Sequence, residues 1–482
     1  MFDSYDDTIF APATVPGTGA IAVVRLSGGR SLEVADKVVR VSGRALRDTE
    51  GYRIRFGTVS DEGGDVLDEV VVSVFRSPHS YTGEDSVEIS CHSSRYIVSS
   101  LLRLLADAGA RPALPGEFTR RAFLNGKMDL AQAEAVADVI SSASAMQHRV
   151  AMTQLRGGYS AELGSLRASL LEIASLLELE LDFSEEDVEF ADRSRLRSLL
   201  EKARGRCSSL ADSFKEGNAI RNGVPVAIIG VPNSGKSTLL NALLGDDRAI
   251  VSDVPGTTRD TVEDCCVIGG VLFRFIDTAG IRESSDVVES EGIRRALKKA
   301  SQARIVLGVV DAFGCGAAGG DIADVSKSVR AQVELILGAV DVSVQKVLIL
   351  VSKSDKIEAN KIVNIVNESV LSFGIKQYGI SVVPISAKEG FGLDKLRIEL
   401  TSIASRGISE DGVTVTNSRH AAALRSSADA LSDVIAGLDR GTPGDLLAED
   451  LRSALDCLGS ITGEISSDEV LGEIFGRFCV GK

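Results

Sequence analysis

Hydrophobic and polar positions change their period along the chain. Up to about residue 120, short apolar stretches between Gly, Pro and Asp residues predict strands, namely AIAVVRLSG, DEVVVSVF and DSVEISCH. From Asp129 onward, apolar residues recur at helical spacing, which predicts successive long amphipathic helices. The repeating positions are Leu163, Leu166, Leu170, Ile173, Leu177 and Leu181, followed by Leu196, Leu199, Ala203, Cys207, Leu210 and Phe214.

A third pattern begins at Val224, where apolar strands alternate with helical stretches until about Arg406. The strands are VPVAIIG, VLFRFID, ARIVLGVVD, KVLILVS and SVVPIS, and their alternation with helices predicts a doubly wound parallel sheet. Helical periodicity then resumes at Leu424, Ala428, Leu431, Ile435 and Leu438, and later at Leu447, Leu451, Leu455 and Leu458. The simplest topology is one helical bundle interrupted by an inserted α/β domain, because insertion is tolerated where the inserted unit's termini lie close together. An independent C-terminal bundle is the alternative.

These patterns divide the 482 residues into four segments. We expect an α+β module over residues 1–120, a first helical part over 121–217, an α/β domain over 218–406 and a second helical part over 407–482. The fold class is therefore multidomain, combining α+β and α/β parts.

Charge and composition narrow the function. There are 53 Lys and Arg against 68 Asp and Glu, a net charge of -15 that argues against nonspecific binding of nucleic acid. Aromatic residues make up 5% and Trp is absent, so a stacking surface for unpaired bases is not expected. The first ten residues lack Lys and Arg, and no apolar run is long enough to span a membrane. We therefore expect a cytoplasmic protein without a membrane anchor.

A phosphate-binding loop follows the first strand of the α/β segment. The strand VPVAIIG runs into GVPNSGKS, which places Gly230, Gly235, Lys236 and Ser237 at the G-x-x-x-x-G-K-S spacing, with TLLNALL behind them. Glycines let backbone N–H groups surround the phosphates, Lys236 adds a positive charge, and the Ser237 hydroxyl can complete a Mg²⁺ shell.

Two later motifs indicate guanine as the base. SKSD follows VLILV, and the Asp355 carboxylate can accept both donors on the Watson–Crick edge of guanine, while the Lys353 stem can cover the base plane. Most GTPases have Asn where Ser352 stands, and the shorter hydroxyl cannot reach as far. The stretch SAK, containing Ser386, Ala387 and Lys388, is expected to close over the base.

Two further motifs are typical of nucleotide-sensing switches. In DTAG, Asp277 would reach Mg²⁺ through water and the Gly280 N–H would contact the outermost phosphate; in GTTRD, the Thr258 hydroxyl would ligate Mg²⁺. The residue after DTAG is Ile281 instead of the Gln that orients the attacking water in Ras, so hydrolysis requires another group. Spacing alone leaves four candidates open, Glu283, Asp286, Glu289 and Glu291.

Over essentially its whole length the chain resembles the MnmE (TrmE) family of tRNA-modification GTPases, within the TrmE-Era-EngA-EngB-Septin-like group. Besides GTTRD and DTAG, the stretches that carry the resemblance are DTIFAPATVPGTGAIAVVRLSG, SYTGEDSVEIS, PGEFTRRAFLNGKMDLAQAEAVADVI and the terminal FCVGK. The resemblance implies an N-terminal folate-binding-like domain and a helical bundle interrupted by an inserted Ras-like P-loop GTPase domain.

The resemblance also implies a catalytic K⁺ that takes the electrostatic place of an arginine finger. Asn233 matches the side-chain ligand, and the carbonyl groups of Ser252, Val254 and Thr257 match the rest of the shell; Mg²⁺ would be held by Ser237 and Thr258. The family's catalytic Glu corresponds to Glu289, so the implied catalytic residues are Glu289, Lys236 and Thr258. The full predicted GTP-binding set is Asn233, Ser234, Gly235, Lys236, Ser237, Thr238, Ser252, Asp253, Val254, Pro255, Gly256, Thr257, Thr258, Asp277, Thr278, Ala279, Gly280, Ser352, Lys353, Asp355, Ser386, Ala387 and Lys388.

In the N-terminal module the resemblance implies a constitutive homodimer that binds 5-formyltetrahydrofolate or a related tetrahydrofolate as one-carbon donor. The matching positions are Arg25, Glu88, Lys127 and the terminal Lys482. Basic groups suit a glutamate tail, and a carboxylate suits the donors of the pterin ring. Cys479 in FCVGK is assigned by the same resemblance to the modification centre, without a defined chemical role.

The function hypothesis is a potassium-dependent GTPase that acts on tRNA together with the FAD protein MnmG, as a heterotetramer or larger complex. It would add a carboxymethylaminomethyl or aminomethyl group at C5 of the wobble uridine (position 34), with hydrolysis driving dimerisation of the GTPase domains and a conformational change. One alternative is a ribosome-assembly GTPase of the Era or Der type, although no KH-type loop with basic residues is evident. Another is a folate-dependent transferase with a merely regulatory GTPase domain.

Overall fold

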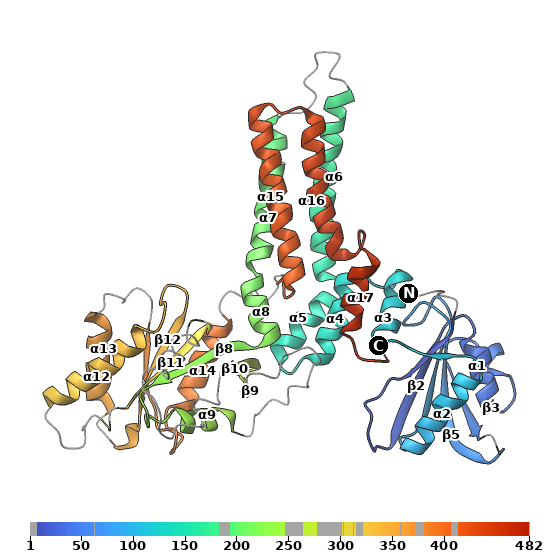
Figure 1. Cartoon of the computed structure of the whole chain (residues 1–482), viewed down its shortest axis with the longest axis horizontal. Coiled ribbons are helices and arrows are strands. Elements are labelled where there is room, and N and C mark those ends of the chain that lie inside the picture. Colours follow the sequence, from blue (N-terminus) through green and yellow to red (C-terminus); the bar gives the residue numbers. More distant parts are fainter. Residues whose placement is uncertain are drawn as a thin grey trace. The chain divides into compact units, whose positions relative to one another are not determined.

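The computed structural model describes residues 7–61, 63–182, 193–245, 264–276, 301, 303–311, 313–314, 322–356, 359–372, 380–405 and 413–481. The chain forms two compact units. Figure 1 labels its helices and strands and colours them in chain order. The first unit comprises Met1–Ala137, Gln154–Leu171 and Arg452–Lys482, and the second comprises Asp138–Thr153 and Glu172–Leu451. The four segment boundaries inferred from the hydrophobic pattern stay predictions. None of the helices in the described ranges is long and apolar enough to cross a membrane.

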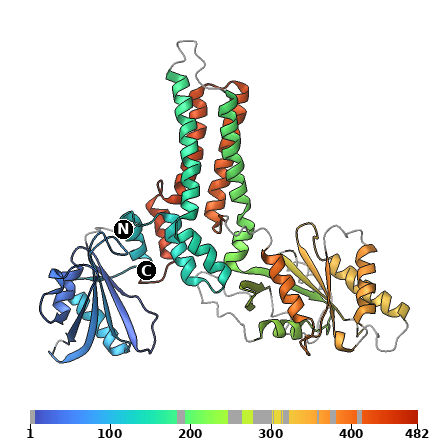
Figure 2. The same cartoon turned by 180° about the vertical axis from the view of Figure 1, so that it is seen from behind.

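The first unit contains a seven-stranded sheet in the order β3-β4-β5-β6-β2-β1-β7. All neighbouring strands are antiparallel except the parallel pair β1–β7. Helices α1 and α2 pack on the sheet and bury Leu32, Leu101 and Leu105 against Val24 and Val72, so this part has the predicted α+β character (Figures 1 and 2). The elements are β1 (Ile9–Pro12), β2 (Ile21–Ser27), α1 (Ser31–Val38), β3 (Val39–Val41), η1 (Leu46–Asp48), β4 (Arg53–Ser60), β5 (Val66–Phe75), β6 (Ser86–His92), α2 (Arg95–Asp107) and β7 (Arg111–Pro112).

The end of the chain packs back into the first unit. Phe475 and Phe478 bury their rings together with Leu130, and the N–H of Gly116 donates to the carbonyl oxygen of Cys479 at 3.4 Å. Phe478 and Cys479 of the motif FCVGK therefore lie beside the start of α3. The helices that wholly or partly belong to this unit are α3 (Glu117–Leu124), α4 (Leu130–Ser141), α5 (Ala145–Leu155), α6 (Gly158–Asp182), α16 (Gly444–Thr462) and α17 (Asp468–Gly476).

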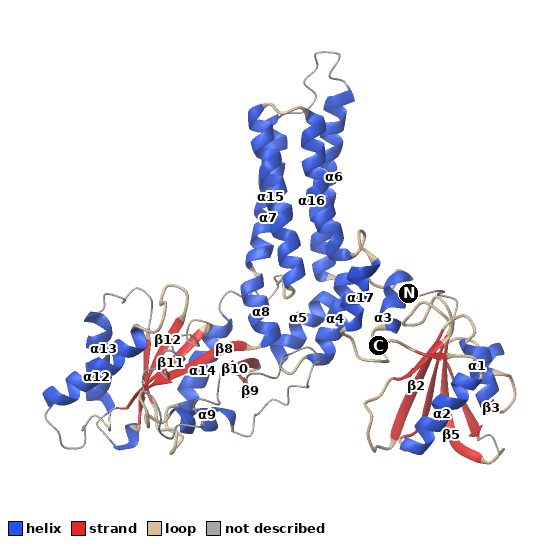
Figure 3. Ribbon diagram, in the orientation of Figure 1, coloured by secondary structure: helices blue, strands red, loops and turns tan. Residues whose placement is uncertain are grey.

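In the second unit two helices from opposite sides of the α/β segment pack side by side. Helix α7 (Arg193–Asp212) lies along α15 (Ser418–Arg440), with Cys207 Sγ 3.7 Å from Ser427 Oγ (Figure 3). Because chain segments before and after the α/β block share one helical core, the prediction of an inserted domain is confirmed and the independent C-terminal bundle is excluded. The short helix α8 (Phe214–Asn222) leads from α7 into the sheet.

The α/β block of the second unit is a six-stranded sheet in the order β13-β12-β11-β8-β10-β9. Every neighbouring pair is parallel except the hairpin β9–β10. The pattern of apolar residues predicted the parallel strands but not the antiparallel edge strand β9. The elements are β8 (Val224–Gly230), α9 (Lys236–Leu244), β9 (Asp264–Ile268), β10 (Val271–Phe275), β11 (Ile305–Asp311), α12 (Ile322–Leu337), β12 (Lys346–Ser352), η3 (Ser354–Lys356), α13 (Ala359–Ser372), β13 (Ser381–Pro384) and α14 (Leu393–Ser405).

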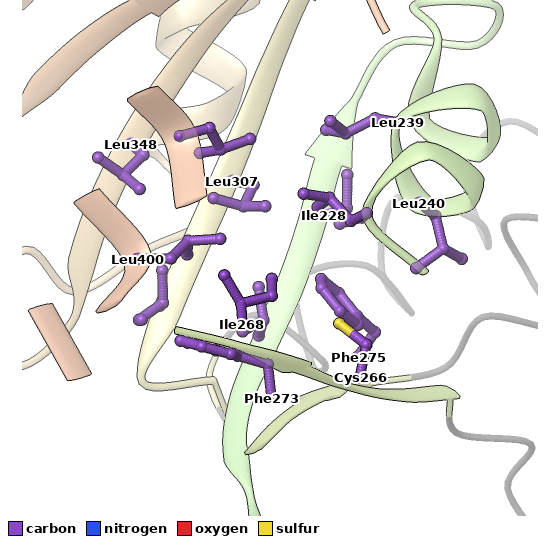
Figure 4. Close-up of a cluster of buried hydrophobic side chains, with 14 of the residues drawn as sticks. Ile228, Leu239, Leu240, Cys266, Ile268, Phe273, Phe275, Leu307, Leu348 and Leu400 are labelled. Carbon is purple, nitrogen blue, oxygen red and sulfur yellow. The ribbon is translucent and has the colours of Figure 1, made fainter. Parts of the chain in front are cut away.

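Alternate residues of the central strands enter two separate cores. Val226 and Ile228 of β8 belong to the core under α9 and α14, whereas Ala227 and Ile229 belong to the core under α12 and α13. Part of the first core, with Ile228, Leu307 and Leu348 from three different strands, is drawn in Figure 4. Burial on both faces explains why these strands are continuous apolar runs. The described segments that follow β8, β12 and β13 start at the carboxyl edge of this sheet.

Candidate functional site

The predicted phosphate-binding loop connects β8 to α9. Gly230 ends β8, Lys236 begins α9, and Gly235 between them adopts a φ of 98°. Asn233 also lies in the left-handed region, with a φ of 60°, which is uncommon for a residue other than glycine. Helix α9 therefore presents its N-terminal amide groups at the end of this loop, an arrangement suited to binding phosphate.

Lys236 turns back over the loop that precedes it. Its Nζ donates to the carbonyl oxygens of Gly230 at 3.0 Å and Val231 at 2.8 Å. Burial lowers the pKa of the Lys236 ammonium, since the charged form loses hydration in this position. The Lys236 ammonium therefore lies at the loop, and its role as a phosphate ligand stays a prediction. Ser237 and Thr238 follow in the first turn of α9.

The predicted base-binding residues follow β12. Lys353, with a φ of 56°, donates to the carbonyl oxygen of Asn233 at 3.1 Å and so reaches the phosphate-binding loop. Ser352 is buried, and its hydroxyl donates to the carbonyl oxygen of Val310 at 3.2 Å. The Ser352 hydroxyl is therefore used inside the sheet. Asp355 is exposed.

The stretch containing Ser386, Ala387 and Lys388 lies beside this segment. The N–H of Ser354 donates to the carbonyl oxygen of Ile385 at 3.1 Å, which joins the two loops. Ser386 is buried at 1% exposure, whereas the Lys388 side chain is exposed. The structure therefore brings the phosphate loop, SKSD and SAK to one edge of the sheet.

The remaining predicted GTP-site residues lie outside the described residues. They are Ser252, Asp253, Val254, Pro255, Gly256, Thr257, Thr258, Asp277, Thr278, Ala279, Gly280 and Glu289, together with Ile281 and the other switch-loop candidates Glu283, Asp286 and Glu291. Of the predicted Mg²⁺ and K⁺ ligands, the structure accordingly places only Ser237 and Asn233.

Sequence reasoning missed Asp311, the last residue of β11. Its Oδ2 lies 2.7 Å from Lys353 Nζ, and only 5% of the residue is exposed. The sequence did contain a signal for Asp311, because a carboxylate at the end of an otherwise apolar strand is unusual enough to mark a candidate site residue. Its partner could not be named from the sequence, because the pairing depends on β11 and β12 being neighbours.

The predicted folate residues lie in the first unit, and two of them form a cross-strand pair. Arg25 on β2 is opposite Glu88 on β6, and Arg25 Nε donates to Glu88 Oε1 at 2.9 Å. The Arg25 guanidinium also lies 5.3 Å from the ring centre of Tyr81 and 5.8 Å from that of Phe118. The cation is therefore held between a carboxylate and two aromatic rings.

Lys127 borders the loop that carries Tyr81. Its Nζ donates to the carbonyl oxygen of Pro78 at 2.9 Å, and its stem packs near Gly83. Arg25 and Lys127 therefore both contact the segment from Pro78 to Gly83, and Glu88 is joined to it only through Arg25. Lys482 lies outside the described residues. Cys479 is exposed, as its assignment to a reaction centre requires.

A partly buried network of charged side chains lies in the same unit. Arg121, 3% exposed, contacts Asp7, Glu84 and Glu117, while Arg111 pairs with Asp7 and Glu117. Burial alone would raise the pKa of Glu117, but hydrogen bonds from Arg111, the Leu114 N–H and Arg121 hold it below its usual value. The same balance, with burial opposed by Arg111 and Arg121, lowers the pKa of Asp7. The network ties Asp7, just before β1, and Arg111 of β7 to α3, and through Arg121 it joins α3 to Glu84 in the loop before β6.

Comparisons with known proteins identify the family of this chain. Residues 8–127 match the family model "GTP-binding protein TrmE N-terminus", and residues 130–479 match the "MnmE helical domain". A tRNA modification GTPase MnmE of Flavobacterium johnsoniae is 46% identical over 478 residues, covering 99% of each chain. The protein of the same name from Bacteroides thetaiotaomicron is 48% identical over 480 residues, again covering 99% of each chain. The chain belongs to the MnmE family of tRNA modification GTPases.

Proposed function

We propose that this GTP hydrolase acts with MnmG to add a carboxymethylaminomethyl or aminomethyl group to C5 of the wobble uridine (position 34) of certain tRNAs. The observation that carries the proposal is that relatives named tRNA modification GTPases align with 99% of the chain, including the modules on both sides of the GTPase block. Such similarity speaks against the ribosome-assembly alternative, whose flanking domains would differ. The net charge of -15 suggests that MnmG supplies much of the affinity for tRNA in a heterotetramer or larger complex, in the cytoplasm.

GTP hydrolysis is proposed to depend on Mg²⁺ and K⁺. Ser237 and Thr258 would hold Mg²⁺, and hydroxyl oxygens suit this hard cation. Asn233 and the carbonyl groups of Ser252, Val254 and Thr257 would hold K⁺. Asn233 supports this assignment, since it is an exposed residue of the phosphate loop and its backbone carbonyl is already bound by Lys353. When bound, both cations would offset negative charge that develops on the phosphates.

Within this scheme Glu289 orients the attacking water, because Ile281 has no polar atom with which to do so. Lys236 and Thr258 contact the phosphates and complete the catalytic set. Meeting of two GTPase domains in a homodimer would close the site. Helices α7 and α15, which flank the GTPase block in sequence and pack together, give the resulting movement a route into the helical domain.

The one-carbon donor is proposed to be 5-formyltetrahydrofolate or a related tetrahydrofolate, held by Arg25, Glu88, Lys127 and Lys482. The chemistry of these residues fits the ligand. The half-buried Glu88 carboxylate suits the N–H groups of a pterin ring, and the basic side chains suit the carboxylates of the glutamate tail. Glu88 already accepts from Arg25, but a carboxylate has capacity for further donors. The partly exposed ring of Tyr81 beside Arg25 would supply a flat apolar surface for the pterin, whereas the Phe118 ring is fully buried and supports Arg25 from within the core.

The test is the nucleoside at position 34 of tRNA from a strain that lacks this protein. We expect uridine unmodified at C5, restored by the wild-type gene and not by Lys236→Ala, because that variant loses the phosphate-binding charge. Normal modification accompanied by immature ribosomal subunits would instead favour the ribosome-assembly alternative. Normal modification with altered folate metabolism would favour the folate-dependent transferase.

A further inference from the structure

Asp311 is held by hydrogen bonds at the end of β11, the strand between β8, which leads into the phosphate loop, and β12, which leads into the predicted base-binding residues. Its Oδ1 accepts from the Gly314 N–H at 2.9 Å, and its own N–H donates to Gln332 Oε1 on α12 at 3.0 Å. The remaining oxygen, Oδ2, faces the Lys353 ammonium at 2.7 Å. The Asp311 side chain is 8% exposed and the Lys353 side chain 32% exposed. A nearly buried, immobilised carboxylate therefore anchors the end of a long, partly exposed cation.

Lys353 is held at a second point by the phosphate loop. The same Nζ donates to the carbonyl oxygen of Asn233 at 3.1 Å, so one ammonium joins the end of β11 to the loop after β8. Lysine has four rotatable side-chain bonds, and an unanchored stem would lose their freedom each time it covered a base. With the ammonium fixed at both acceptors, the stem is ordered before the base arrives.

Ser352 makes this anchoring more important. Asn is usual at that position, but the Ser352 hydroxyl is directed to the Val310 carbonyl oxygen within the sheet. Asp311 and Ser352 are partners in the β11–β12 register, so the residue before Lys353 is tied to the same strand that carries Asp311. The side-chain connection from SKSD to the phosphate loop accordingly runs through Lys353 in the described part of the chain.

We propose that Asp311 is a positioning residue for guanine-nucleotide binding. It holds the Lys353 ammonium against the Asn233 carbonyl group, so that the Lys353 stem forms a preformed wall of the base site. Loss of the Asp311 charge would free the stem and shorten the residence time of the nucleotide. Asp311 does not contact the reacting phosphate in this scheme.

The experiment is a double-mutant cycle on the full-length protein, read by stopped-flow dissociation of a fluorescent GDP. Asp311→Asn keeps the size of the side chain and an acceptor for Gly314 but removes the charge. Lys353→Met keeps an apolar stem but removes the ammonium. We expect each single variant to release GDP about tenfold faster, because an ion pair of this kind acts mainly on dissociation. The double variant should be no faster than Lys353→Met alone.

Asp324→Asn is the matched control, since it removes the same charge from an exposed residue in the first turn of α12. It should leave GDP release unchanged. If Asp311→Asn does not fold, Asp311→Ser replaces it in the cycle, with thermal unfolding recorded for every variant. An Asp311 variant that releases GDP at the wild-type rate would overturn the proposal. The proposal would also be overturned if Asp311→Asn accelerated GDP release by the same factor in the Lys353→Met variant as in the wild type. Asp311 would then act on the strand and not through Lys353. The measurement requires no tRNA, potassium or folate, so its outcome does not depend on the proposals made for those ligands.

Discussion

A Cβ atom on Gly230 would lie 2.5 Å from the carbonyl oxygen of Val309. The two residues are partners in the parallel register of β8 and β11, so the oxygen cannot move without disturbing the centre of the sheet. The same Cβ would also lie 2.9 Å from Ser234 Oγ in the phosphate loop. The first glycine of the motif is therefore required by close packing at the point where the strand becomes the loop.

Gly230→Ala should displace the phosphate loop and weaken GTP binding. We expect a loss of affinity of at least about a hundredfold and a destabilisation of about 1–3 kcal/mol from overpacking. Isothermal titration with GTP and thermal unfolding measure the two effects. Gly205→Ala on α7 is the control, because its added Cβ meets no atom within 4 Å. That change should be neutral or stabilise by up to about 1 kcal/mol. Equal GTP affinity for Gly230→Ala and the wild type would contradict the packing argument.

Asp355→Asn should weaken GTP binding and shift the base preference towards xanthine. The amide would place a donor where guanine presents donors of its own, and hydrogen bonds to a charged group contribute about 1.5–3 kcal/mol each. A loss of about a hundredfold in GTP affinity, with XTP becoming the better competitor for fluorescent GDP, is the expected result. The matched control is Asp394→Asn, whose side chain is 93% exposed on α14. Unchanged competition by GTP would remove Asp355 from the base site.

Arg25→Ala should reduce binding of 5-formyltetrahydrofolate about tenfold or more, because it removes a cation and leaves Glu88 without its partner. Binding is measured by titration calorimetry. Arg53→Ala on β4 of the same sheet serves as the control, since Arg53 is 65% exposed and pairs only with Glu50 among the described residues. If both variants bind the folate as the wild type does, the ligand does not lie beside Arg25.

The first unit should lose stability in acid. Glu117 and Asp7 have folded-state pKa values below their usual 4.5 and 3.8, so they stabilise the fold above those values. This contribution is lost as the pH falls through the lowered folded-state pKa values. Urea unfolding followed by circular dichroism should therefore give a nearly constant free energy of unfolding from pH 7 to about 5 and a steep decline below about pH 4.

Glu117→Gln tests the assignment. It should lower the free energy of unfolding at pH 7 by about 2–4 kcal/mol, because it removes a buried charge that pairs with Arg111 and Arg121. It should also flatten the decline in acid. Glu33→Gln, an exposed change on α1, should alter neither quantity by more than about 0.5 kcal/mol. An acid slope identical in Glu117→Gln and the wild type would assign the pH dependence to other carboxylates.

Much of the fold follows from local patterns, whereas contacts across the chain do not. The parallel strands were predicted because burial on both faces makes them uniformly apolar. The edge strand β9 was missed because it begins with Asp264 and its two adjacent cysteines give no clear alternation. Asp264 is nevertheless 2% exposed, so local polarity was misleading there.

The same distinction holds for the sites. The phosphate loop was predicted because all its residues are close in sequence. Arg25 and Glu88 are 63 positions apart, and their pairing depends on the register of two strands. The pairing of Asp311 with Lys353 depends on strand order. No local sequence pattern specifies either of these two pairings. The folate residues were predicted as one site only through the resemblance to a family.

Replacing K⁺ by Na⁺ should depress GTP turnover, because the smaller ion fits the same cage of oxygen atoms poorly. Ile281 supplies no polar atom at the position of the usual Gln, and Asn233 in the phosphate loop is the proposed side-chain ligand of the cation. We expect at least about a tenfold loss of turnover and a matching loss of nucleotide-dependent pairing of GTPase domains. Nucleotide affinity should change much less. Turnover in matched K⁺ and Na⁺ buffers, with light scattering on a transition-state mimic, measures these effects.

Three variants separate the steps. Asn233→Ala should reproduce the Na⁺ behaviour in K⁺ buffer, because it removes the only side-chain ligand proposed for the cation. Glu289→Ala should keep the pairing of GTPase domains and abolish hydrolysis, since it removes the group proposed to orient water. Asn241→Ala, an exposed change further along α9, should behave as the wild type does in both salts. Equal turnover of the wild type in K⁺ and Na⁺ would exclude the bound-cation mechanism and assign charge stabilisation to a partner protein.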